Sequence, residues 1–187
     1  MKQKKAKKIV EEKLPKKRYE HSIRVAETAV KLAEIFGGDT DIVEMAGILH
    51  DYAKYDELSV LYQSVTHYGL DNQLLSYNSE ILHGPVAAAY MKDKYEIDDE
   101  VYDAIYYHTT GRAGMGLNEK LIFISDYIEP NRSQPGVERI RDIIYTEKNL
   151  DKAIYEISKN TALYLIENDK HIYPKTIECL NYYNLEK

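Results

Sequence analysis

The sequence predicts an all-α fold, arranged as a compact multi-helix bundle. Apolar residues recur at the three- and four-residue spacing of amphipathic helices along most of the 187 residues. No strand-like alternation of useful length interrupts this pattern, and Gly, Pro and Asp residues stand between the apolar stripes, where helices begin or end. The length fits one domain, so we expect a single domain over residues 1–187.

The first 14 residues form a basic N-terminal helix or extension in this prediction. Lysines cluster at residues 2–8, and no apolar signal-peptide core follows them. A solvated end of a first helix is the simpler interpretation of this cluster. The alternative is a contact with an anionic partner such as RNA.

The pattern over residues 15–83 predicts two helices followed by a less regular segment. Residues 15–36 carry a helical apolar stripe that Gly37-Gly38 breaks, and Asp39 can cap a second helix that continues through His50. Residues 56–83 contain Gly69 and several Asn and Ser residues, so we expect them to be less regular. Pro85 is expected at the first position of the helix that follows.

The second half of the chain predicts a further series of helices. Asp98-Asp99-Glu100 opens one that extends to His108, and Gly111 can close it before a loop over residues 110–116. Residues 121–129 are strongly apolar and stop at Pro130. The remaining helices are expected over residues 137–145, over residues 150–166 and, as a short last one, from Pro174.

Composition limits the classes of partner and compartment. The formal net charge is −6, which disfavours broad binding of nucleic acid because such binding needs a basic surface. No run of about 18 apolar residues is present, so no membrane span is expected. Cys179 is the single cysteine and excludes an intrachain disulfide, which favours a cytoplasmic location.

Several polar residues stand where a core residue is expected. His21, His50, His108 and Asp126 each fall on an apolar stripe, and Asp51 follows His50 directly. One such residue alone is usually a hydrogen-bonded core side chain. Together they place imidazole and carboxylate groups in the interior, where an unpaired carboxylate is costly. This combination is a ligand set for Zn, Mn or Fe, so the set predicts a metal site.

Lys54 lies one helical turn after His50. Its ammonium would lie beside the metal and suit a phosphate oxygen. A solvated lysine at a helix end is an equally good interpretation of this spacing.

The order His21, His50-Asp51, Asp126 resembles the HD superfamily of metal-dependent phosphohydrolases. Segments around these residues strengthen the likeness and extend it over residues 7–176. Within the superfamily they resemble the bacterial YqeK-type symmetrical bis(5′-nucleosyl)-tetraphosphatases. The segments that carry this resemblance are residues 18–26, 49–54, 82–88, 108–112 and 126–132.

The resemblance implies hydrolysis of diadenosine tetraphosphate to two ADP by a metal-activated water. It implies an iron-type centre of one or two ions, with other divalent transition metals as alternatives. The metal ligands carried over are His21, His50, Asp51 and Asp126. Asp51 is the best candidate for ordering or deprotonating the water, and the other catalytic candidates are Lys54, His83 and His108, the two histidines being phosphate contacts or ligands of a second ion.

The expected substrate contacts extend beyond the metal ligands. Arg24 lies one turn after His21, where a surface role is equally plausible, and Tyr173 belongs to a segment expected near the nucleoside. Ser125 and the stretch from Ser133 depart from the family pattern, and the second departure can alter nucleoside contacts. The full set of expected substrate contacts is His21, Arg24, Lys54, His83, His108, Thr109, Arg132, Ser133 and Tyr173.

Two other functions use the same residues. One is a phosphohydrolase of another nucleotide, which the same metal set would serve. The other is a metal- and nucleotide-binding regulatory module without turnover, which an incomplete ligand set would favour. The sequence leaves the oligomeric state open, with a homodimer as one option.

Overall fold

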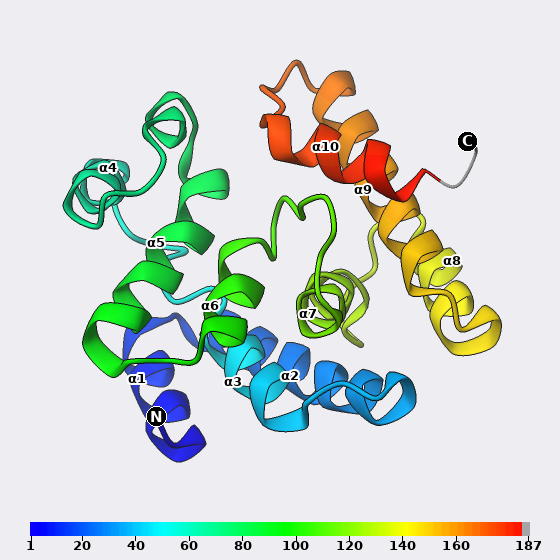
Figure 1. The fold of residues 1–187 in the computed structure, drawn as a ribbon, viewed down its shortest axis with the longest axis horizontal. Coiled ribbons are helices and arrows are strands. Elements are labelled where there is room, and N and C mark those ends of the chain that lie inside the picture. The colour runs from blue at the N-terminus through cyan, green and yellow to red at the C-terminus, as the bar shows by residue number, and fades with distance from the viewer. Residues whose placement is uncertain (185–187) are drawn as a thin grey trace.

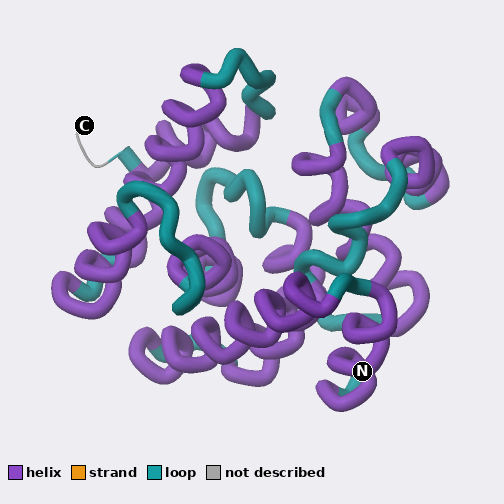
Figure 2. The backbone as a smooth tube through the Cα atoms, turned by 180° about the vertical axis from the view of Figure 1, so that it is seen from behind, coloured by secondary structure: helices purple, strands orange, loops and turns teal. Residues whose placement is uncertain are grey.

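The computed structural model describes residues 1–184 and forms them into helices and loops, without a strand among those residues (Figure 2). The predicted all-α class is confirmed. The elements are α1 (Gln3–Lys13), α2 (Lys16–Phe36), α3 (Thr40–Leu49), α4 (Leu58–His67), the 3₁₀-helix η1 (Asn72–Ser76), α5 (Ser79–Tyr95), α6 (Asp99–Tyr106), α7 (Leu117–Ile128), α8 (Val137–Asp142), the π-helical segment η2 (Ile143–Glu147), α9 (Leu150–Glu167) and α10 (Pro174–Tyr183).

Helix α7 lies at the centre of the molecule, with α4, α5 and α6 to its left in Figure 1, α2 and α3 below it and α8 to α10 on its other side. It packs against α2, α3 and α6 and, from the other side, against α8 and α9. Leu121, Ile122 and Ile124 of this helix are completely buried. This central position explains why residues 121–129 are apolar almost all round, as a helix buried on several faces requires.

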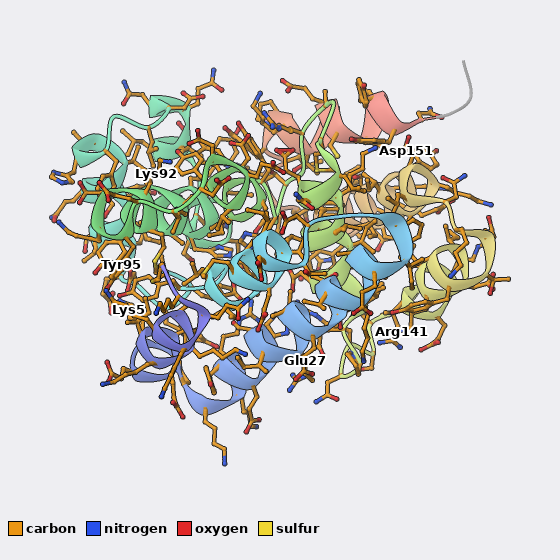
Figure 3. All side chains as sticks on the ribbon, turned by 60° about the horizontal axis from the view of Figure 1, so that its bottom comes forward. Lys5, Glu27, Lys92, Tyr95, Arg141 and Asp151 are labelled. Carbon is orange, nitrogen blue, oxygen red and sulfur yellow. The ribbon has the colours of Figure 1, made fainter. Side chains whose placement is uncertain are left out.

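The basic N-terminal segment is helix α1, and it is packed onto the bundle. Ala6 and Val10 are completely buried on its inner face. Lys7 forms an ion pair with Glu44 of α3 at 2.9 Å, and the Lys5 ammonium lies 4.7 Å from the centre of the Tyr95 ring (Figure 3). Several of the clustered lysines therefore have partners within the chain.

Two expectations for residues 56–85 are wrong. The segment expected to be loose contains α4 and η1, because Leu61 and Val65 give α4 a buried face. Pro85 lies inside α5 and not at its first position, because Asn78 accepts a hydrogen bond from the Glu80 amide at 3.1 Å and starts the helix at Ser79. The helix tolerates Pro85 with one backbone donor fewer.

Helix α6 is shorter than its apolar stripe predicted. It begins after its Asp98 cap as expected but ends at Tyr106, so His108 lies in the turn that follows. Gly111 closes this turn: its φ of 62° is in the left-handed region that favours glycine, and its amide donates to the Tyr107 carbonyl at 2.8 Å. The early end of α6 lets the His108 ring turn toward α5, where its centre lies 4.9 Å from that of His83.

Helices α2 and α3 approach closely at one glycine. A Cβ atom on Gly47 would lie 2.6 Å from the Cα and 2.8 Å from the backbone nitrogen of Ala26. Glycine is therefore required where the two helices cross. His21 precedes Ala26 in α2 by little more than one turn, and His50 follows Gly47 at the end of α3. The contact between Ala26 and Gly47 therefore also fixes the distance between the two histidines.

None of the helices formed by the described residues combines the length and the apolar character that a membrane span requires.

Substitution Gly47→Ala is expected to lower the free energy of unfolding by about 1–3 kcal/mol, the usual cost of overpacking a close-packed interior. Gly116→Ala is the control, because a Cβ at that position meets no atom within 4 Å. Urea denaturation followed by circular dichroism measures both variants. Equal stability of the two would contradict the close approach of α2 and α3.

Candidate metal centre

Five parts of the fold bring the polar residues of the predicted site together. Helix α3 ends at Leu49, so His50 and Asp51 occupy the turn directly after it. The other contributions come from His21 of α2, His83 of α5, His108 after α6 and Asp126 of α7. The structure thus gathers into one cluster the ligands and histidines that the sequence places up to 105 residues apart.

The Asp51 carboxylate lies between the four histidines of this cluster. Its Oδ2 atom is 2.9 Å from His50 Nε2 and 3.6 Å from His21 Nε2. Its Oδ1 atom is 3.2 Å from His83 Nε2 and 4.0 Å from His108 Nε2. All four rings therefore direct the same nitrogen, Nε2, toward one carboxylate.

Asp126 completes the cluster from the side of α7. Its Oδ1 atom lies 3.0 Å from His21 Nε2 and 4.0 Å from His50 Nε2. Among residues 1–184, two groups of three residues have ligand atoms within 4.8 Å of one another, the first formed by His21, His50 and Asp126 and the second by His50, Asp51 and His108. Imidazole and carboxylate groups at these separations suit one or two divalent transition-metal ions.

The ring nitrogens on the other side of the histidines are all engaged. The Nδ1 atoms of His50, His83 and His108 donate to the backbone carbonyls of Gly47, Ser79 and Ile105 at 2.7, 3.1 and 2.7 Å. Because a carbonyl only accepts, each Nδ1 must carry the proton. The lone pair of a neutral ring is then on Nε2, the nitrogen that points into the cluster, which is the tautomer that ligation requires.

Several of the atoms that face one another in the cluster lack a hydrogen bond. Nε2 of His21 and His50 and both carboxylate oxygens of Asp51 are buried and have no aligned hydrogen-bonding partner, although their distances are short. Buried polar atoms left in this way are rare because each costs free energy. Coordination of a cation would satisfy all of them, so the residues present fit a metal ion.

The charges of the cluster agree with a role in ligation. Burial alone raises the pKa of the Asp51 carboxyl, but the neighbouring His50 and His83 outweigh it and hold that pKa well below its usual range. Burial, together with the nearby His83 and His50, holds the pKa of His108 well below its usual value. Asp51 is therefore an anion and His108 a neutral ring, the forms in which each can bind a metal.

Arginine and lysine side chains surround the carboxylates of the site. Arg18 Nε lies 2.5 Å from Asp51 Oδ2. Arg132 donates through Nη2 to Asp126 Oδ1 at 2.5 Å and through Nε to the Asp126 carbonyl at 2.8 Å. Lys54, expected beside the phosphates, is largely buried and forms a 2.6 Å ion pair with Glu80.

Two of the residues in the site were not predicted as functional. Arg18 contacts Asp51, and the buried Glu129 contacts both His21 and Arg24. Their spacing could have indicated a place beside the site, because Arg18 lies three residues before His21 and Glu129 lies three residues after Asp126. Residues at this separation share a helix face.

The other expected substrate contacts lie in different surroundings. Thr109 Oγ1 is 3.0 Å from His108 Nε2 and so borders the cluster. Arg24 is engaged by Glu129, and Ser133 is exposed in the turn after α7. Tyr173 is buried edge-to-face against Tyr77, with ring centres 4.9 Å apart, and burial raises its pKa to about 12. Their contacts with a substrate remain predictions.

Comparison with known proteins identifies the family. The sequence profile of the HD domain matches residues 18–131, the segment that contains all the residues of the cluster. The chain belongs to the HD-domain family. The resemblance seen in the sequence is thereby confirmed.

Relatives within this family match nearly the whole chain. A symmetrical bis(5′-nucleosyl)-tetraphosphatase of Staphylococcus aureus is 64% identical over 181 residues, which cover 96% of this chain and 93% of the relative. The protein of the same name from Bacillus subtilis is 39% identical over 174 residues, which cover 92% of each chain. The chain is thus an HD-domain protein similar throughout to this named group.

A solved structure agrees with the fold. The crystal structure of an HD superfamily hydrolase from Clostridium acetobutylicum, described as predicted and as involved in NAD metabolism, superposes with a TM-score of 0.92. It is 37% identical in sequence, and the match covers 100% of this chain and 99% of that one.

His50→Ala is expected to weaken metal binding by more than about 100-fold, because it removes a proposed ligand whereas loss of an outer-shell partner costs about 10- to 100-fold. His67→Ala, a change at the exposed end of α4, is expected to leave binding unchanged. Metal content after equilibrium dialysis measures both. Equal metal content in the two variants would remove His50 from the ligand set.

Proposed function

We propose that this HD-domain protein is a metal-dependent hydrolase that cleaves diadenosine tetraphosphate symmetrically into two ADP. The observation that carries the proposal is the buried cluster of histidines and carboxylates in which Nε2 of His21 and His50 and both oxygens of Asp51 lack hydrogen bonds. Its support from relatives is the 64% identity, over 96% of the chain, to a protein named as a symmetrical bis(5′-nucleosyl)-tetraphosphatase.

His21, His50, Asp51 and Asp126 are the proposed metal ligands. His83 and His108 lie on the Oδ1 side of Asp51, where they would contact phosphate or take part in holding a second ion. We propose iron as the resident metal, since its divalent form accepts imidazole and carboxylate together. When bound, such an ion supplies positive charge that brings the pKa of water toward neutrality and stabilises phosphate oxygens.

Asp51 is proposed to orient the attacking water and to take up its proton. The carboxylate is ionised and completely buried, and it borders all four histidines, so water in the cluster would be within its reach. Attack on one of the two inner phosphorus atoms of the tetraphosphate would break the bond to the bridging oxygen between them. Each side would then leave as a nucleoside diphosphate.

Cations at the rim of the cluster are proposed to bind the phosphate chain. Arg132 offers a planar guanidinium suited to two phosphate oxygens, and Lys54 a compact charge. Both are held by carboxylates, Arg132 by Asp126 and Lys54 by Glu80, and are thus fixed in direction before a phosphate arrives. Preorganised charge of this kind stabilises a transition state without reorganisation.

The remaining contacts belong to the same proposal. Thr109 would donate to a phosphate oxygen beside His108. Arg24, Ser133 and Tyr173 are proposed nearer the ends of the substrate. We also place the protein in the cytoplasm, where the buried thiol of Cys179 would stay reduced.

Product analysis tests the proposed reaction. The iron-loaded protein is incubated with diadenosine tetraphosphate, and the nucleotides are separated by chromatography, with His50→Ala as the control. ADP is expected as the sole product, and the variant is expected to be inactive. ATP with AMP would show asymmetric cleavage, and an intact substrate beside metal-loaded protein would favour another nucleotide or a binding module.

A further inference from the structure

We propose that Glu129 is a positioning residue, which sets the tautomer and the direction of the His21 ring. The Oε1 atom of Glu129 lies 3.1 Å from His21 Nδ1. Glu129 is only 2% exposed and follows directly after α7, three residues beyond Asp126. One end of α7 thus provides both a proposed metal ligand and the carboxylate behind another.

Nδ1 of His21 is hydrogen-bonded to a side chain, whereas Nδ1 of each of the other three histidines in the cluster is hydrogen-bonded to a backbone carbonyl. His50, His83 and His108 each donate Nδ1–H to a carbonyl three or four residues earlier in the chain. The partner of His21 is instead 108 residues away. Its orientation therefore depends on the packing of α2 against α7 and on the identity of residue 129.

Glu129 is itself held in one orientation. Its Oε2 atom accepts hydrogen bonds from Arg24 Nε at 2.7 Å and from the Asn131 amide at 2.8 Å. Two donors, one of them a guanidinium, face a single oxygen of Glu129, which is the arrangement expected around a carboxylate anion. A carboxylate only accepts hydrogen bonds, so His21 must carry a proton on Nδ1, which leaves Nε2 as the nitrogen that can bind a metal ion.

This geometry makes Glu129→Gln an informative change. Arg24 Nε and the Asn131 amide donate to the Oε2 position at 2.7 and 2.8 Å, whereas Arg24 Nη2 reaches Oε1 only at 3.5 Å. The amide oxygen of Gln would therefore occupy the Oε2 position. The NH₂ group would then face His21 Nδ1 from the Oε1 position and would require that nitrogen to accept. The ring proton would move to Nε2, which is the atom that has to bind the metal, with hardly any change in side-chain volume.

Glu119 at the other end of α7 offers a matched control. It is also a buried carboxylate, and it accepts hydrogen bonds from Arg112 Nε and from the Gly116 amide, both at 3.1 Å. Histidine is not among the partners of Glu119 in the described hydrogen bonds and ion pairs. Glu119→Gln thus changes the same chemical group without a change at the metal ligands.

The affinity for zinc is measured by competition with a chromophoric chelator for the wild type and both variants. Glu129→Gln is expected to bind zinc about 10- to 100-fold more weakly, as for other partners of metal-ligating histidines. Glu119→Gln is expected to bind zinc as the wild type does.

Unchanged zinc affinity in Glu129→Gln, or an equal loss in both variants, would overturn the proposal. If Glu129→Gln does not fold, Arg24→Gln replaces it, and unchanged affinity there overturns the proposal as well.

Histidine ¹⁵N spectra of the metal-free proteins give a reading that does not depend on catalysis. Nδ1 of His21 is expected to carry a proton in the wild type and in Glu119→Gln, and to lack one in Glu129→Gln. A wild-type His21 protonated on Nε2 alone overturns the proposal. The inference rests on the proposed role of His21 as a metal ligand. If the wild type failed to bind zinc, that role would be wrong. The protonation of His21 Nδ1 would still show whether Glu129 sets the tautomer of the ring.

Discussion

Burial of the Asp51 carboxylate is the constraint on which the rest of the site depends. The side chain has no exposed surface, and a buried carboxylate without compensation costs several kcal/mol. Compensation comes from Arg18 of α2, from the adjacent His50 and from His83 of α5. These elements must meet at one point for the charge to be tolerated, and a cation between them would satisfy the atoms that still lack hydrogen bonds.

Helix α7 connects this centre to the rest of the bundle. Its last turns carry Asp126 and lead to Glu129, so a single helix both faces the cluster and supports His21 from behind. Arg141, labelled in Figure 3, donates through Nη2 to the carbonyls of Glu129 and Arg132 at 2.8 and 3.0 Å. The turn after α7 is therefore fixed, and with it the direction of Arg132 toward Asp126.

The sequence predicted the helices and the inward-facing residues, but not the contacts between helices. Histidine and aspartate on apolar stripes are conspicuous because burial of such groups requires a reason, and this identified His21, His50 and Asp126. The sequence shows that Arg18 and Glu129 each lie three residues from a predicted ligand. Their roles depend on contacts with Asp51 and His21, which are 33 and 108 residues away along the chain. The early start of α5 was missed because the Asn78 cap outweighs the preference of Pro85 for a first turn.

The proposed metal site is tested by a crystal structure of the iron-loaded protein, with diffraction recorded on both sides of the iron absorption edge. Anomalous density is expected in contact with Nε2 of His21 and His50 and with the carboxylates of Asp51 and Asp126. The proposed site would be contradicted by iron bound elsewhere, or by a cluster whose histidines and carboxylates are hydrogen-bonded to one another with no metal between them.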